Sequence, residues 1–300
     1  MVSEDSAGSR EPGTLRLGRG QFGPERTLVM AIVNRTPDSF YRPGSTWDET
    51  AAMERVHEAV AEGADIIDIG GVPAKPGDEV SPEEEIRRTV PFIAAVREAH
   101  PDVVISVDTW RHEVGRAACD AGADLLNDTW GGWDPKLTEV AAECGSAIIC
   151  SHAGGLPPRT RPFRLRYDDV VRDVLDTVLG LAGRALRAGV EPERIIIDPA
   201  HDFGKNTWHS LEVSRRLREL TATGWPVLLS ASRKDFVGEA VGAADPDERL
   251  AGTLATTALA AADGARIFRA HDVTATRQAL DMVAAIRGTV PPAGTVRGLA

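Results

Sequence analysis

The sequence is poor in cysteine and in basic residues, and it has no long apolar run. Three cysteines occur among 300 residues, and their spacing fits no metal-binding pattern, so we expect reduced thiols with structural roles. The 45 acidic residues outnumber the 34 basic ones and give a net charge of −11. Because like charges repel, we expect neither a nucleic acid nor an anionic membrane as a partner.

Two further absences concern targeting and cofactor motifs. No apolar run approaches the roughly 18 residues of a membrane span, and residues 1–13 lack the apolar segment of a signal peptide, so we expect a cytoplasmic protein. No Gly-x-Gly-x-x-Gly turn follows the first apolar run, which disfavours a dinucleotide-binding sheet. The polar residues 1–13 and 288–300 are expected to form a disordered N-terminus and a flexible C-terminal tail.

Between these ends, short apolar runs alternate with longer amphipathic stretches. The composition, 42% hydrophobic and 26% charged, is that of a soluble globular domain. The eight apolar runs lie at residues 27–33, 65–69, 103–107, 124–126, 147–150, 194–197, 226–229 and 266–268. Runs of this length without polar alternation are typical of strands buried on both faces of a parallel sheet.

The stretches between the runs have the patterns of helices. Valines recur at helical spacing in residues 167–189, and Ser81 followed by Glu84 predicts a capping box at a helix start. Eight strands, each followed by a helix, predict an α/β fold, a single (β/α)₈ TIM barrel over residues 14–287. A doubly wound open sheet is the alternative. Residues 13–23 are expected to form a short N-terminal hairpin over the bottom of the barrel.

Polar or charged residues follow every apolar run. These residues are Asn34, Asp68, Asp108, Asn127, Asp128, Ser151, His152, Asp198, Ser232, Arg233, Lys234, Arg269 and His271. Active sites of such barrels are built at the carboxyl ends of the strands, so we expect these side chains to converge on one mouth. Taken alone, Asp68 or Asp128 is more often a helix cap or turn former. Eight strand ends in succession favour a site.

The predicted mouth is sorted by charge. Acidic and amide groups come from the third, fourth and sixth strands, and their oxygens can accept hydrogen bonds from the N–H edge of a heterocycle. Basic groups, Arg233, Lys234, Arg269 and His271, come from the seventh and eighth strands and suit an anion such as phosphate. An ordinary surface ion pair is the alternative for Arg233 taken alone.

Six motifs, in this order along the chain, resemble those of the dihydropteroate synthase family. They are IVNRTPDSF, ISVDTWRHEV, LLNDTWGG, IIIDPAHDFGK, SRKDFVG and FRAHDV. The resemblance extends over about residues 14–287 and implies a (β/α)₈ barrel that is commonly dimeric. The family joins 6-hydroxymethyl-7,8-dihydropterin diphosphate to 4-aminobenzoate in folate biosynthesis and releases diphosphate. Sulfonamides and sulfones compete with the aminobenzoate.

The resemblance implies roles for the residues of the mouth. Asn34 matches the residue that helps to bind Mg²⁺ and diphosphate, so Mg²⁺ is the expected cofactor. The edge of the pterin would be held by Asp108, Asn127, Asp198 and Lys234. Asp198 would accept hydrogen bonds from the exocyclic amine and from a ring N–H, a bidentate arrangement that discriminates well.

The remaining matches concern the diphosphate and the second substrate. Arg269 and His271 match the diphosphate site, while Phe203, Lys205 and Arg233 match the residues that line the aminobenzoate pocket and stack on the pterin. In the family reaction the diphosphate leaves positive charge on the pterin methylene, which the arylamine attacks, so positioning and electrostatics carry the catalysis. The predicted catalytic residues are Asp108, Lys234 and Arg269.

Departures from the family pattern concentrate in the loops that close over the second substrate. The family has Gly-Gly-Glu-Ser-Thr-Arg-Pro-Gly where residues 70–77 read GGVPAKPG. Val72 and Ala74 therefore stand where the family has polar side chains. Lys75 replaces an arginine that could bind phosphate through two hydrogen bonds, whereas a lysine supplies only a point charge.

The loop after the first strand departs as well. Arg35 stands at a valine position, and Arg42 appears where an acid is expected. Because the pterin side is retained, we interpret the chain as a divergent paralogue that binds pterin or sulfone-type ligands and has weak or no synthase activity. A fully active synthase, in which Arg42 and Lys75 replace the missing groups, is the alternative. A pterin-dependent methyltransferase is disfavoured because no corrinoid domain is present. The expected assembly is a homodimer.

Overall fold

The computed structural model describes residues 13–36, 47–160 and 165–297. Parallel strands form one sheet with the order β8, β7, β6, β5, β4, β3, β10 and β9. Their bounds are β3 Leu28–Asn34, β4 Ile66–Gly70, β5 Val104–Asp108, β6 Leu125–Asp128, β7 Ala147–Ser151, β8 Ile195–Asp198, β9 Leu228–Leu229 and β10 Ile267–Ala270. A parallel bridge between Ile197 and Val227 joins the two ends of the sheet. The predicted eight-stranded barrel is confirmed.

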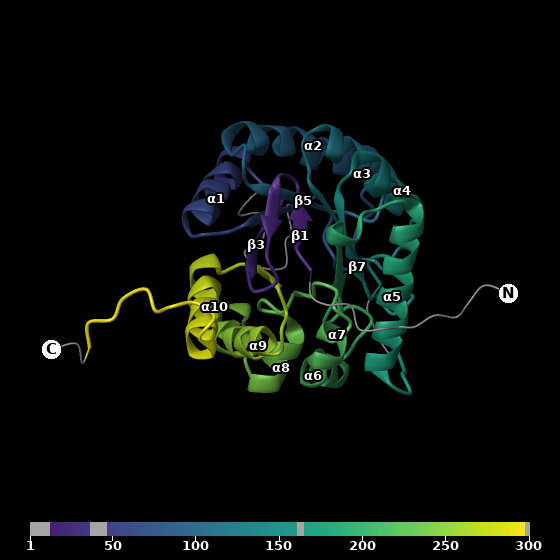
Figure 1. Cartoon of the computed structure of the whole chain (residues 1–300). Coiled ribbons are helices and arrows are strands. Elements are labelled where there is room, and N and C mark those ends of the chain that lie inside the picture. Colours follow the sequence, from purple (N-terminus) through teal and green to yellow (C-terminus); the bar gives the residue numbers. More distant parts are fainter. Residues whose placement is uncertain (1–12, 37–46, 161–164, 298–300) are drawn as a thin grey trace.

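Helices surround the barrel, as Figure 1 shows. Their bounds are α1 Glu49–Ala61, α2 Pro82–Ala99, α3 His112–Asp120, α4 Lys136–Cys144, α5 Val170–Ala188, α6 Thr207–Arg215, α7 Leu217–Thr221, α8 Asp235–Val241, α9 Leu250–Ala262 and α10 Val273–Arg287. Two helices, rather than one, follow each of β8 and β9. In the part of the chain that the structure describes, none of the helices combines the length and apolarity needed to cross a bilayer.

Two apolar layers explain why the strand sequences are mainly apolar. In β7, Ala147 and Ile149 belong to the core inside the barrel, while Ile148 and Cys150 belong to the core between the sheet and the helices. This alternation follows from the strand geometry, in which successive side chains point to opposite faces. Both faces of each strand are therefore buried, as the uninterrupted apolar runs predicted.

The predicted hairpin closes the bottom of the barrel. It consists of β1 Leu15–Leu17 and β2 Gly20–Phe22, which pair antiparallel, and it is drawn in purple in Figure 1. Leu15 and Leu17 are fully buried in the core inside the barrel. The guanidinium of Arg266 donates hydrogen bonds to the carbonyl oxygens of Gly13 and Phe22 and ties the hairpin to the start of β10.

The structure agrees only in part with the predicted helix cap and chain ends. The Ser81 hydroxyl accepts a hydrogen bond from the Glu84 N–H at 3.2 Å and caps α2. The Glu84 carboxylate, however, accepts from Arg87 and Arg88, so only half of the predicted capping box forms. Beyond α10, residues 288–297 are exposed and form neither helix nor strand. Their flexibility stays a prediction, and the predicted disordered N-terminus lies outside the described residues apart from Gly13.

Candidate active site at the mouth of the barrel

A hydrogen-bonded network centred on Asp68 forms the floor of the mouth. The Asp68 carboxylate is fully buried and accepts from the Ser106 hydroxyl at 2.7 Å and from the Asn127 amide nitrogen at 3.3 Å. It also accepts from Nε of Arg269 at 2.6 Å. Because a buried carboxylate needs such partners to offset its desolvation, Asp68 fixes three other side chains from three strands.

Arg269 connects this floor to Asp108. Its Nη2 donates to the Asp108 carboxylate at 3.1 Å, and the Thr129 hydroxyl donates to the same carboxylate at 2.7 Å. Burial raises the pKa of Asp108 to about 6, although the charge of Arg269 opposes this shift. The acidic and amide groups come from β5, β6 and β8 and the basic groups from β10 and the loop after β9, as predicted, but their side chains form ion pairs across the mouth. The physical reason is that a buried arginine without a carboxylate partner would be costly.

Asp198, Lys234 and Phe203 lie together on the other side of the mouth. The Asp198 carboxylate accepts from the Ala200 N–H at 2.7 Å, and burial raises its pKa although Lys234 opposes the shift. The Lys234 ammonium donates to the carbonyl oxygen of His201 at 2.7 Å and lies 4.9 Å from the centroid of the Phe203 ring. Burial lowers the pKa of Lys234 to about 8.

Lys205 lies beneath this group and is almost fully buried. Its ammonium donates to the carbonyl oxygens of His152, Ala200 and Phe203 at 3.0 to 3.2 Å and contacts Nδ1 of His152 at 2.6 Å. Nε2 of His152 lies 2.7 Å from the Asp173 carboxylate. Burial lowers the pKa of Lys205 to about 7. These contacts give Lys205 a place in the support of two loops, rather than on an open pocket wall.

The loop that follows β8 is shaped by these two lysines. Ala200 and Asp202 have positive φ angles of 48° and 68°, as does Gly204 at 61°. Left-handed residues along the loop turn its carbonyl oxygens toward the ammonium groups of Lys205 and Lys234. The segment therefore keeps a backbone that favours glycine, although two of these positions carry side chains.

Arg233 and His271 differ from the cations expected at the mouth. Arg233 is buried, and its Nε and Nη2 each donate to the Asp272 carboxylate at 2.8 Å. Burial, together with the charge of Arg269, lowers the pKa of His271 to about 3, so its imidazole is neutral at physiological pH. Of the four residues in the predicted basic cluster, Arg233 is held in a bidentate ion pair and His271 is uncharged.

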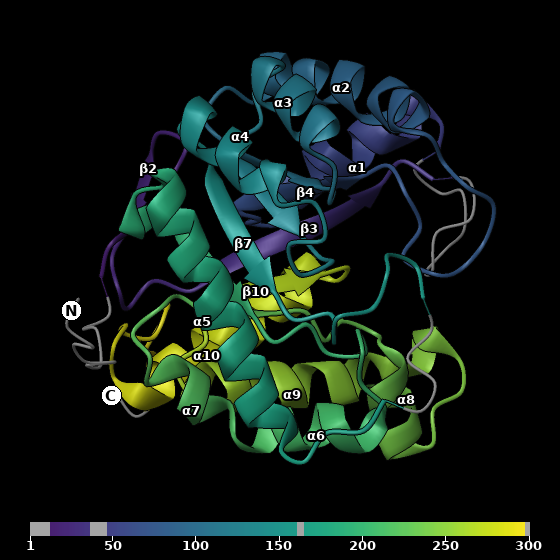
Figure 2. The same cartoon turned by 90° about the vertical axis from the view of Figure 1, so that its right-hand side faces the viewer.

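The loop after β4 is held by its main chain. Arg88 donates to the carbonyl oxygen of Gly71 at 3.0 Å, and Arg159 donates to those of Lys75 and Asp78 at 3.1 and 2.5 Å. Because β5 and β6 separate β4 from β7, the contact made by Arg159 spans the mouth above those strands; Figure 2 shows the blue loop after β4 beside the teal loop after β7. The altered side chains of this loop are only partly covered, with Val72 half-buried and with Ala74 and Lys75 exposed.

Asn34 is the last residue of β3, and Arg35, which follows it, points to the other side of the sheet. The Asn34 amide oxygen lies 3.3 Å from where a Cβ on Gly70 would be, and the Asp108 Cβ lies 3.7 Å from the same point. Gly70 therefore lets Asn34 approach Asp108. The Arg35 guanidinium instead donates to the Trp47 carbonyl oxygen at 2.8 Å, on the helix side. Arg42 lies outside the described residues.

An aromatic wall was missed by the sequence reasoning. The rings of Trp110 and Trp130 meet edge to face with centroids 6.4 Å apart, and Trp130 meets Phe203 in the same way at 5.1 Å. Both tryptophans close an Asp-Thr-Trp tripeptide whose aspartate is the last residue of a strand, at residues 108–110 and 128–130. That repeated tripeptide was the available signal. A wall of flat apolar surface beside the buried acids suits a flat heteroaromatic ligand.

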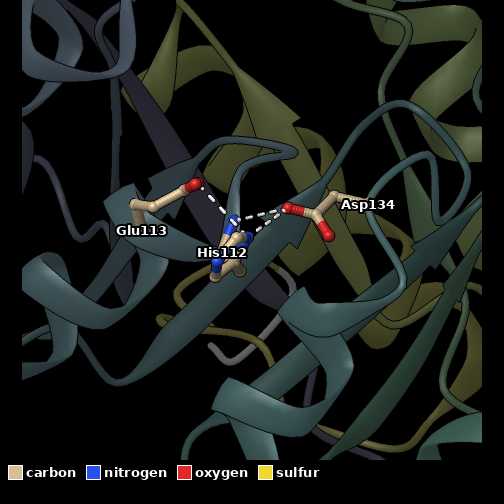
Figure 3. A group of neighbouring side chains, drawn as sticks. All are labelled: His112, Glu113 and Asp134. Carbon is tan, nitrogen blue, oxygen red and sulfur yellow. Dashed lines mark hydrogen bonds and ion pairs between the residues drawn. The ribbon is translucent and has the colours of Figure 1, made fainter.

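Among the described residues, one His/Asp/Glu cluster has the proximity needed for a metal ion. His112, Glu113 and Asp134 gather at the start of α3, as Figure 3 shows. The Asp134 carboxylate already accepts from the His112 main-chain N–H at 3.0 Å, from its ring nitrogen at 2.6 Å and from the Lys136 N–H at 3.1 Å. Asp134 thus serves both helix starts as a cap, and the positive ends of two helices disfavour a cation there.

Comparisons with known proteins agree with this geometry. The family described as pterin binding enzyme matches residues 30–271. A protein of Mycobacterium tuberculosis named inactive dihydropteroate synthase 2 is 59% identical over 280 residues, which cover 92% of this chain and 88% of that protein. The dihydropteroate synthase of a Synechocystis species is 41% identical over 270 residues, covering 89% of this chain and 93% of the relative.

The three-dimensional comparison agrees over nearly the same length. The crystal structure of the Yersinia pestis dihydropteroate synthase with a sulfonamide drug complex matches with a TM-score of 0.86 at 33% identity. The match covers 92% of this chain and 100% of that one. The barrel and its surrounding helices are therefore shared along almost the whole chain.

Proposed function

Because the chain belongs to the pterin-binding enzyme family, we propose that it binds a pterin at the mouth of its barrel and has weak or absent dihydropteroate synthase activity. One contrast carries this proposal. The floor of the mouth is hydrogen-bonded, whereas the loop after β4 carries a half-buried Val72 and exposed Ala74 and Lys75 where the family has polar side chains and an arginine. The relative named inactive dihydropteroate synthase 2 supports the same conclusion.

The floor has the groups that a pterin needs. Asp198 offers carboxylate oxygens to the amine and ring N–H, and Lys234 can donate to the ring oxygen or nitrogen. Phe203 and Trp130 supply flat surface beside them. Because these groups are buried and fixed by neighbours, they act at low local dielectric and need little reorganisation when a ligand binds.

The basic residues expected to bind the diphosphate are less available than the groups expected to bind the pterin. Arg269 already binds Asp68 and Asp108, Arg233 binds Asp272, and His271 is neutral. A diphosphate must therefore compete with carboxylates for these cations. The second substrate, 4-aminobenzoate or a sulfonamide or sulfone in its place, would meet a loop that is held by its carbonyl groups. Misplaced loops lower the rate of reaction without removing ligand binding.

Mg²⁺ is the proposed cofactor, and the residues present fit it in part. Asn34 supplies an amide oxygen, and Asp108 lies across Gly70 from it. Mg²⁺ takes oxygen ligands and typically uses one or two protein groups together with substrate phosphates and waters. Asn34 would hold the ion, and the ion would neutralise charge on the departing diphosphate.

A homodimer through α9 and α10 is also proposed. The exposed positions of α9 are apolar, including Ala251, Ala255 and the 70% exposed Leu259. On the neighbouring α10, Met282 and Ile286 are 60% and 72% exposed. A helix that is apolar on every face is normally buried, so we expect a second copy to cover it. Leu259→Glu should convert the dimer to a monomer in analytical ultracentrifugation.

A cytoplasmic location of the protein stays an expectation.

A fully active synthase is the second candidate, because Asn127, Asp198, Lys234 and Arg269 are all retained. Two measurements separate the candidates. Calorimetry with a pterin should show binding, and Asp198→Asn should weaken it by about 1.5–3 kcal/mol, the scale of a hydrogen bond to a charged group. Asp176→Asn, a change on the exposed face of α5, is the control and should leave binding unchanged.

The second measurement is turnover of pterin diphosphate and 4-aminobenzoate with Mg²⁺, supported by complementation of a strain that lacks its own synthase. We expect slow or undetectable product and no complementation. A rate comparable to that of an ordinary family member would refute the loss of activity. A wild-type protein without pterin affinity would refute the binding.

A further inference from the structure

One buried hydroxyl at the mouth has no partner among the described residues. Ser151 is the last residue of β7, is fully buried, and forms no hydrogen bond through its Oγ. Buried polar atoms in folded proteins nearly always have a hydrogen-bond partner, so an exception calls for a physical reason. The position of Ser151 in the barrel suggests one.

Ser151 points into the barrel toward the floor. Ala147 and Ile149 of the same strand lie in the core inside the barrel, so the alternation of β7 places Ser151 on the inner side, above Ile149. Its register partner on β8 is Asp198, and on the other side β6 pairs Asn127 with Ile149. The hydroxyl therefore lies on the strand between the two residues that would hold the edge of a heterocycle.

The hydroxyl complements these neighbours chemically. An ionised Asp198 can only accept hydrogen bonds, and the amide nitrogen of Asn127 is already donated to Asp68. A serine hydroxyl can donate one hydrogen bond and accept others. It is thus a donor on the strand between Asp198, which accepts, and Asn127, whose amide nitrogen is already used.

We propose that Ser151 is a further ligand-binding residue, whose hydroxyl donates a hydrogen bond to a ring nitrogen of the pterin beside Asp198. This inference rests on the proposed function. It makes Ser151 a specificity-determining residue, since a ligand with carbon instead of nitrogen at that point would leave the hydroxyl unpaired.

The proposal predicts opposite behaviour of the free and the bound protein. Ser151→Ala removes an unpaired buried hydroxyl, so the unfolding temperature of the free protein should stay the same or rise. Its affinity for pterin, measured by calorimetry, should fall about three- to tenfold, the scale of one neutral hydrogen bond. Ser151→Cys keeps the size but has a weaker donor, so its affinity should lie between those of the wild type and Ser151→Ala.

Ser146→Ala is the matched control. Ser146 directly precedes the same strand at the opposite end of the barrel and is also buried, so its removal should leave pterin affinity unchanged. Equal affinity of Ser151→Ala and the wild type would overturn the role of Ser151 and leave the proposed function standing. An equal loss in both alanine variants would also overturn it, because the effect would not be local. A wild-type protein that binds no pterin would overturn both.

Discussion

The left-handed backbone at Ala200 permits a quantitative test of the loop after β8. Ala200 has a φ of 48°, a conformation that costs an L-residue other than glycine about 1–2 kcal/mol. Ala200→Gly removes this strain. It also removes a buried methyl group, at about 0.8 kcal/mol, and increases the freedom of the unfolded chain, at about 0.4–1 kcal/mol. The opposing changes are similar in size, so the stability of Ala200→Gly should stay close to that of the wild type.

Ala153→Gly provides the comparison that isolates the strain. Ala153 is 2% exposed and Ala200 is 1% exposed, and both lie in loops at the mouth. Ala153 is absent from the residues with positive φ, so glycine relieves no strain there. This variant should lose about 1–2 kcal/mol, the sum of the methyl and unfolded-chain contributions. The two variants should therefore differ by about 1–2 kcal/mol, which equals the strain.

Equilibrium unfolding in urea measures both free energies under one condition. The slopes of the two transitions should agree, so that the midpoints report stability alone. Equal destabilisation by the two substitutions would show that Ala200 is unstrained and that lysine–carbonyl contacts do not impose a left-handed backbone on this loop. Pterin affinity serves as a second readout and should be retained in Ala200→Gly, since the loop keeps its shape.

Three further outcomes are expected. The pKa of Lys205 lies at about 7 in the folded protein against an ordinary 10.5, so the unfolded chain binds more protons between these values and the free energy of unfolding should rise with pH across that window. Lys205→Met should flatten this rise in urea unfolding measured at pH 7 and 9. Asp68→Ala leaves Arg269 short of a buried partner and should destabilise the fold by about 3–5 kcal/mol in the same assay, whereas a loss below 1 kcal/mol would remove Asp68 from the centre of the floor. Arg159→Ala should speed proteolytic cleavage of the loop after β4, while Arg172→Ala, on the exposed face of α5, should not.

The barrel itself was predictable because strand burial leaves a direct trace in the sequence. Residues 65–69 and 103–107 are mainly apolar, and the structure places β4 and β5 there within one residue, with both faces buried. The run at 226–229 was the weakest match, since β9 covers only Leu228–Leu229 and Val227 contributes a bridge to β8. The hydrophobic pattern specifies burial, whereas the closing contact between β8 and β9 is a single bridge that leaves little trace in the sequence.

The candidate site was predictable in its residues more than in its contacts. The ends of the predicted strands pointed to four site residues, and all four lie at the mouth: Asp108, Asn127, Asp198 and Arg269. The ion pair between Arg269 and Asp68 joins residues 201 positions apart in the sequence. The sequence alone does not show which side chains from different strands of the barrel come into contact. The role of Lys205 was obscured for a related reason, because its partners are main-chain carbonyls that carry no residue-specific signal.

The hairpin beneath the barrel has a consequence for the traffic of ligands. Leu15 and Leu17 fill the lower end of the apolar core inside the barrel, so a ligand can reach the Asp68 floor only from the mouth. A compound seated on the Asp68 floor has to arrive before anything that rests above it, and it has to depart afterwards.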